Sequence, residues 1–165
     1  MRLTKRFYDR IFGSGPAIAA ASGICLLIGW AIARATPAAG WANSPDVRFA
    51  VLGAGSLLAL VVIAWSVHTL RPERRGTELV VGGPFRFVRH PLYAACLSLF
   101  GPSLVIALAH PAYAGALVLI HLLANRLVRR EEAMMAAIFP QAYLAYCAHT
   151  GRFWPRYHVG RPTKT

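Results

Sequence analysis

The sequence predicts an all-α fold, a polytopic membrane helix bundle of about four transmembrane helices with a cytoplasmic C-terminal helical segment. The 165 residues are 56% hydrophobic and 15% charged, with a mean hydropathy of +0.47, whereas soluble domains carry roughly 25% charged residues. Four apolar stretches approach the roughly 20 residues that a spanning helix needs. Basic residues gather on one side of these stretches. We therefore expect residues 1–165 to form a single integral-membrane domain.

The first two apolar stretches predict two spanning helices. The first covers residues 17–33. A cleavable signal peptide is the alternative there, but the stretch is longer than the usual signal-peptide core of about 7–15 residues. The second covers residues 49–70, where Gly53, Gly55 and Ser56 are small enough for close packing against another helix.

The second pair of stretches predicts one interrupted helix and one long helix. The third span, residues 93–109, contains Gly101-Pro102, and a proline inside a helix removes a hydrogen bond. The fourth begins at residue 112, leaves the membrane near residue 128 and continues without proline to Phe139. Such a helix reaches about 40 Å at ~1.5 Å per residue, more than a hydrocarbon core of about 30 Å. Its last turns should lie in the cytoplasm, followed by a short helix over residues 141–149.

The basic residues predict the orientation. Of the eighteen, only Arg34 and Arg48 fall on one side of the spans, so the other sixteen lie on the opposite side. The positive-inside rule then places both termini in the cytoplasm. The net charge of +12 is thereby explained by topology and by attraction to membrane lipid, so nucleic acid is not an expected partner. The small size points to an integral protein of a bacterial inner membrane.

No metal site is expected. The three cysteines include no C-x-x-C spacing, and no two histidines stand four residues apart, as a helical metal site requires. Cys25 and Cys96 lie in apolar spans, where a cysteine usually behaves as a small buried hydrophobe.

Three polar blocks lie at the cytoplasmic side of the third and fourth spans. The first is residues 82–93, Gly-Gly-Pro-Phe-Arg-Phe-Val-Arg-His-Pro-Leu-Tyr, the second is Glu131-Glu132, and the third is Arg152-Phe153-Trp154-Pro155. Their order and spacing resemble the isoprenylcysteine carboxyl methyltransferase and phospholipid methyltransferase superfamily, small integral-membrane methyltransferases. The resemblance covers residues 82–155. Placing charged groups at a membrane boundary costs free energy, so these blocks are candidates for a functional site.

The resemblance implies S-adenosylmethionine as the cofactor. This molecule needs a cation for its carboxylate, a carboxylate for its ammonium and a flat partner for its adenosine. Arg89 and His90 are expected to serve the carboxylate, Glu131 or Glu132 the ammonium, and Tyr93 or Phe87 the adenosine. The matching positions of the family's cofactor site are Arg89, His90, Pro91, Tyr93, Glu131 and Glu132.

Helix geometry adds Asn125 and separates the two glutamates. His121, Asn125, Arg129 and Glu132 follow helical spacing and form one stripe. Adjacent helical residues point about 100° apart, so Glu131 and Glu132 cannot face one ligand equally. The stripe favours Glu132 as the inward residue and Glu131 as the residue at the rim.

The implied reaction is methyl transfer to a lipophilic acceptor, either an isoprenylcysteine carboxylate or a phospholipid or other small lipophilic molecule. By resemblance Arg152 is expected to orient an anionic acceptor. An amine acceptor must lose a proton, for which Glu131 or His90 is a candidate base.

Two other interpretations stay open. One is an NADPH-dependent membrane reductase of the sterol reductase type, which shares the arginine-histidine-proline block; its usual arginine-aspartate pair is missing, because the last aspartate of this chain is Asp46. The other is a membrane protein without catalysis, in which Arg86 and Arg89 only set the topology.

Overall fold

The computed structural model describes residues 14–36, 44–70 and 78–156, and these residues are almost entirely helical. No strand occurs among them, so the predicted all-α bundle is confirmed. In chain order the elements are α2 (Gly15–Ala35), α3 (Pro45–Thr69), η2 (Gly83–Arg86), α4 (Pro91–Ala94), η3 (Ala95–Phe100), α5 (Gly101–Leu108), α6 (Pro111–Ile138) and α7 (Pro140–His149).

Four helices in this part of the chain are long and apolar enough to cross a membrane. They are α2, α3, the continuous run from Pro91 to Leu108, and α6. Their boundaries lie within a few residues of the predicted ones. Large apolar side chains such as Leu27 and Leu60 are exposed on α2 and α3, as expected of surfaces that face lipid.

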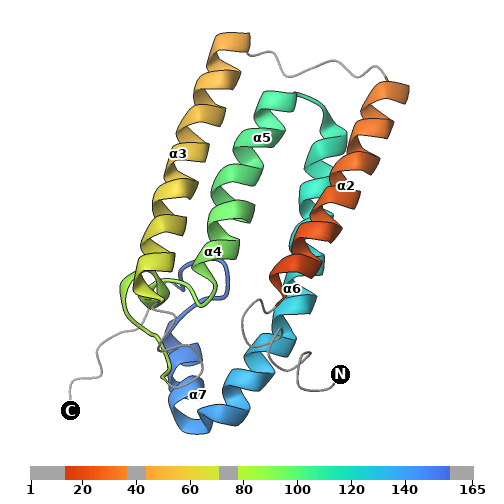
Figure 1. Cartoon of the computed structure of the whole chain (residues 1–165). Helices are drawn as coiled ribbons and strands as arrows, with labels where there is room; N and C mark the ends of the chain where they lie inside the picture. Colours follow the sequence, from red (N-terminus) through yellow and green to blue (C-terminus); the bar gives the residue numbers. More distant parts are fainter. Residues whose placement is uncertain (1–13, 37–43, 71–77, 157–165) are drawn as a thin grey trace, which may run out of the picture.

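The long helices pack side by side in the order α3, α5, α6 and α2 (Figure 1). Small residues make these contacts close. Gly55 of α3 faces Ser103 of α5, and Gly29 of α2 faces Tyr113 and Ala116 of α6. Because α2 packs chiefly on α6, it stands at one side of the bundle.

The third span is interrupted where the sequence predicts it. α4 is followed by the π-helical segment η3, and α5 then begins at Gly101, with Pro102 in its first turn. A π-helical turn often accommodates a break in the regular hydrogen-bond ladder. α5 ends at Leu108, and the capping residue Ala109 adopts a left-handed conformation with φ of 50°.

α6 is the longest helix, with 28 residues. At ~1.5 Å per residue it extends about 42 Å and continues past the membrane core. Pro140 starts α7, which turns back below the bundle (Figure 1). The C-terminal end of α6 therefore lies beside α7 and the residues that follow it.

Candidate active site

Three segments far apart in the sequence meet at one end of the bundle, where α6 continues into α7. The backbone before α4 pairs with the segment after α7 through an isolated parallel bridge between Val88 and Gly151. The Arg89 amide donates to the Gly151 carbonyl at 2.8 Å, and the His90 amide donates to the Arg152 carbonyl at 3.1 Å. This pairing fixes the first and third sequence blocks against each other, with α6 and its two glutamates beside them.

Gly83 sets the backbone conformation at the start of η2, the turn that precedes Arg89 and His90. Its φ is +56°, a left-handed conformation that glycine adopts without steric cost. A Cβ atom there would lie 2.6 Å from the Thr69 hydroxyl oxygen at the end of α3. The turn η2 can therefore pack directly on α3, which sets the position of Arg89 and His90.

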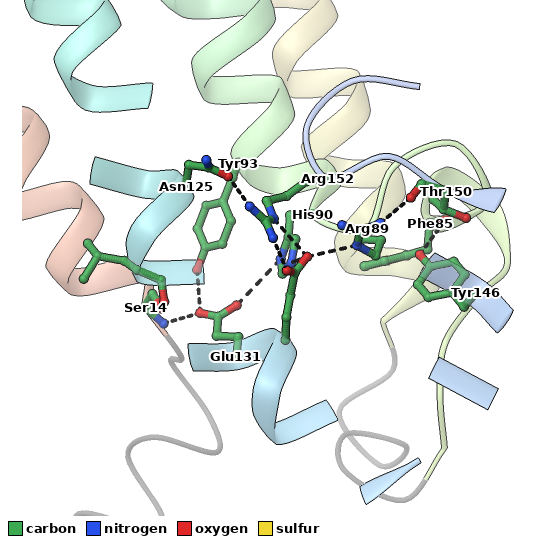
Figure 2. A network of polar contacts seen from close by, with 12 residues as sticks. Ser14, Phe85, Arg89, His90, Tyr93, Asn125, Glu131, Tyr146, Thr150 and Arg152 are labelled. Atoms are coloured by element: carbon green, nitrogen blue, oxygen red, sulfur yellow. Dashed lines mark hydrogen bonds and ion pairs between the residues drawn. The ribbon is translucent and has the colours of Figure 1, made fainter. Parts of the chain in front are cut away.

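Glu132 is the centre of a charged group that we call the Glu132 cluster. Figure 2 shows its partners Arg89 and Arg152 from two different segments of the chain. Its Oε1 accepts hydrogen bonds from Arg89 Nε at 2.9 Å and from Arg152 Nε at 3.0 Å. Arg152 Nη2 donates to its other oxygen, and Arg152 Nη1 donates to the Asn125 side-chain carbonyl. Arg89 Nη1 in turn donates to the Thr150 carbonyl. The cluster thus consists of Arg89, Asn125, Glu132, Thr150 and Arg152.

The guanidinium of Arg152 is anchored within this cluster, and each of its two Nη atoms keeps one further N–H for a ligand. Each of its three nitrogens donates to Glu132 or Asn125. The hydrogen bonds to Glu132 raise the pKa of the Arg152 guanidinium, so it stays charged. A carboxylate held by two arginines at about one-eighth exposure is a strong, largely desolvated arrangement.

Glu131 faces a different set of partners. Its Oε1 accepts a hydrogen bond from the Tyr93 hydroxyl at 3.1 Å and another from the Ser14 amide. The Ser14 hydroxyl also donates to the Leu127 carbonyl, which fixes the start of α2 on α6. The two neighbouring glutamates therefore have different hydrogen-bond partners, as expected of adjacent helical residues that point about 100° apart.

His90 lies between the two carboxylates. Its Nδ1 is 3.7 Å from Glu131 Oε2, and its Nε2 is 3.5 Å from Glu132 Oε1. The ring stacks on Tyr93, with centroids 5.8 Å apart, and meets Phe153 edge-on at 6.1 Å. Nε2 is buried and makes no hydrogen bond with the described residues. A buried polar atom without a partner is uncommon in folded proteins.

The structure brings nearly all the predicted site residues together. Those in direct contact are Arg89, His90, Tyr93, Asn125, Glu131, Glu132 and Arg152. Pro91 begins α4 directly after them. Phe87 lies apart, with its ring against Arg86 and Trp65. Whether each residue holds a cofactor stays a prediction.

Several partners were not predicted from the sequence. Ser14, Thr150 and the buried Phe153 complete the site, yet only Phe153 belongs to a sequence block. Tyr146 donates to the Phe85 carbonyl at 2.5 Å and ties α7 to η2. Burial raises the pKa of Tyr146, which stays a neutral donor at physiological pH.

An apolar groove leads away from this site into the span region. Its volume is about 460 Å³, and its walls come from α2, from the run α4 to α5, and from α6. Gly15 and Tyr93 line it near the site, and Leu108 and Tyr113 line it far from the site. Its lining residues include no charged side chain. A lipophilic chain is the kind of ligand that such a groove can hold.

The protein is thus an integral-membrane helix bundle that carries a charged site at one end of the bundle, next to an apolar groove. The chain belongs to the isoprenylcysteine carboxyl methyltransferase family, whose family model matches residues 49–137, more than half of the sequence. The match runs from α3 almost to the end of α6, so residues 138–155 lie outside it. No curated protein and no solved structure matches the chain.

Proposed function

We propose that this membrane methyltransferase uses S-adenosylmethionine and methylates a lipophilic acceptor that reaches the site through the apolar groove. The observation that carries the proposal is the position of the Glu132 cluster beside one end of that groove. One side of α6 offers charges for a polar cofactor, and the other offers an apolar channel. Family membership supports the reaction class.

The described residues fit the amino-acid end of this cofactor. That end carries a carboxylate and an ammonium, and the Glu132 cluster presents two guanidinium groups, a carboxylate and an amide carbonyl. Arg89, Arg152 and the unpartnered His90 Nε2 are the groups for the carboxylate. Glu132 and Asn125 are the groups for the ammonium. Bound S-adenosylmethionine supplies an electrophilic methyl group on a sulfonium.

The protein promotes the reaction by aligning the methyl donor with the acceptor and by excluding water from the site. Methyl transfer is an in-line displacement, so most of the rate enhancement comes from holding the reacting groups in position. Phe153 is buried against His90 and Tyr93, and Tyr93 also lines the groove. The pairing of residues 88–90 with residues 150–152 keeps Arg89 and Arg152 in place.

We infer the cellular setting from the same arrangement. The site lies at the end of the bundle that carries most basic residues, which suits a cytoplasmic cofactor. Both termini are then cytoplasmic, and the groove opens towards the lipid of a bacterial inner membrane. The acceptor partner is accordingly a lipid or a small lipophilic molecule.

The test is a pair of binding measurements on purified protein in detergent. S-adenosylhomocysteine should bind, and NADPH, the ligand of the reductase alternative, should not. The family match gives that alternative no support. Membrane extract incubated with the protein and a radiolabelled methyl donor should then yield a labelled lipophilic product. Binding of NADPH without binding of S-adenosylhomocysteine would overturn the proposal.

A further inference from the structure

The exposed face of α6 carries three arginines, Arg126, Arg129 and Arg130, that take no part in the Glu132 cluster. We call them the arginine triad. Side chains three and four residues apart are neighbours on a helix surface, with Cβ atoms about 5–6 Å apart. Each guanidinium presents a planar fork of N–H donors, which matches the oxygens of a phosphate group. The triad is therefore a surface suited to an anion, outside the candidate active site.

The acidic residues of the chain cannot neutralise the arginine triad. The next two residues of α6, Glu131 and Glu132, bind the groups of the candidate active site, and no described residue forms an ion pair with the triad. Residues 1–13 hold one acidic side chain, Asp9, against four basic ones, so they cannot balance three arginines either. The whole chain has six acidic residues for eighteen basic ones. The charge of the triad thus favours an anion from outside the chain.

The arginine triad lies at the membrane boundary. The spanning helix α2 begins at Gly15, and the hydroxyl of the preceding Ser14 donates to the Leu127 carbonyl of α6 at 3.1 Å. The start of one spanning helix is therefore level with residue 127, between the arginines of the triad. The phosphate groups of membrane lipids lie near this depth, and long basic side chains reach them readily.

An exposed apolar strip of α6 continues from the arginine triad into the membrane. It consists of Gly115, Leu119 and Leu122, which follow helical spacing towards the triad. A Cβ atom at Gly115 would meet nothing within 4 Å, so the strip is open there. The apolar groove uses another face of α6, to which Leu117 and Ile120 belong. A ligand on the strip would thus be separate from an acceptor in the groove.

We propose that the arginine triad binds the phosphate of an anionic phospholipid, whose acyl chain lies along the strip of Gly115, Leu119 and Leu122. The strip favours a lipid over a soluble anion, because only a lipid gains from contact with both the charged and the apolar part of this face. A net negative headgroup is required, since the ammonium of a zwitterionic lipid offsets the attraction of its phosphate. The inference does not depend on methyl transfer.

The test is native mass spectrometry of the purified full-length protein in detergent. The protein is titrated with phosphatidylglycerol and with phosphatidylcholine of the same acyl chains. A basic residue near a lipid surface contributes about fivefold in affinity for anionic lipid, so the triad should favour phosphatidylglycerol by roughly a hundredfold. Equal binding of the two lipids by the wild-type protein overturns the proposal.

Two double variants with the same change of charge assign the preference to the arginine triad. Arg126→Gln/Arg130→Gln should lower the affinity for phosphatidylglycerol by roughly twentyfold and leave that for phosphatidylcholine unchanged. Arg34→Gln/Arg86→Gln removes two exposed arginines from α2 and η2 and should keep the wild-type preference. Retention of the preference in the first variant, or an equal loss in the second, overturns the assignment.

Two further measurements separate this site from a soluble-anion site and from the candidate active site. Inorganic phosphate at the concentration of the lipid should not displace phosphatidylglycerol, because it makes no contact with Leu119 and Leu122. Displacement would overturn the assignment to a lipid. Arg126→Gln/Arg130→Gln should bind S-adenosylhomocysteine as the wild-type protein does, and a loss there would overturn the separation of the two sites.

Discussion

Glu131 and Glu132 are neighbours in sequence but have different surroundings. Glu132 is bound by two arginines, and Glu131 by a phenol and a backbone amide. Removing the charge of Glu132 leaves the guanidinium groups of Arg89 and Arg152 without their shared anion. The cost of such a change is larger than that of losing a neutral hydrogen bond.

We therefore expect Glu132→Gln to weaken S-adenosylhomocysteine binding more than Glu131→Gln does. A charge-assisted hydrogen bond is worth about 1.5–3 kcal/mol, roughly ten- to a hundredfold in affinity. Titration calorimetry in detergent measures both variants. Equal losses, or a larger loss for Glu131→Gln, would show that the cofactor faces the other side of α6.

A substitution of Arg89 can distinguish a role in cofactor binding from a role in membrane topology. Its guanidinium donates from Nε to Glu132 and from Nη1 to Thr150, and a lysine, with one nitrogen, cannot reproduce this planar fork. Arg89→Lys should thus lower cofactor affinity by about tenfold or more. The positive-inside rule counts lysine and arginine alike, so membrane insertion should not change.

His90→Ala gives the companion measurement. It removes the unpartnered Nε2, so cofactor affinity should fall while expression and insertion stay intact. If both variants bind the cofactor as tightly as the wild-type protein does, residues 82–93 do not have the proposed role in binding. The topological explanation of Arg89 would then be sufficient.

How far the sequence predicts the site depends on whether residues share a helix. The stripe on α6 correctly placed Asn125 and Glu132 on one side, because helical spacing fixes that relation. It could not show that Arg152 joins them, since no local rule relates residues 150–152 to residues 88–90. The contact of Ser14 with Glu131 could not be predicted either, because it depends on how α2 packs on α6.

Among the secondary-structure elements, hydropathy and proline positions predicted the four spanning segments and α7, but not the π-helical form of η3. This works in a membrane because a spanning segment must satisfy its own backbone. The contacts between helices depend on smaller features. Gly55 is an example: a Cβ atom there would lie 2.4 Å from the Ser103 hydroxyl oxygen, whereas one at Gly53 would meet nothing within 4 Å.

These two glycines form a matched pair on α3. Gly55→Ala should destabilise the bundle by about 1–3 kcal/mol, because the added methyl group forces α3 away from α5. Gly53→Ala should be neutral or slightly stabilising, since alanine favours the helix by up to about 1 kcal/mol. Thermal unfolding in detergent compares them. A similar melting temperature for both variants would contradict the close α3–α5 contact.

At the scale of the whole molecule, the fold places the charged site at one end of four spanning helices. Its orientation in the membrane follows from the basic residues. The sequence predicts sixteen of the eighteen on the site's side and only Arg34 and Arg48 on the other. Arg48 donates to the Ala107 carbonyl near the end of α5, at the end of the bundle away from the site.

This orientation predicts opposite results for two single-cysteine positions. Ser44→Cys, at the exposed start of α3, should react with a membrane-impermeant maleimide added to intact cells. Lys164→Cys, in the tail beyond the described residues, should react only after the cells are opened. Each is built in a background without Cys25, Cys96 and Cys147, so that one site gives the signal. Labelling of Lys164→Cys in intact cells would place the tail outside, and a cofactor from the cytoplasm would then have no route to the Glu132 cluster.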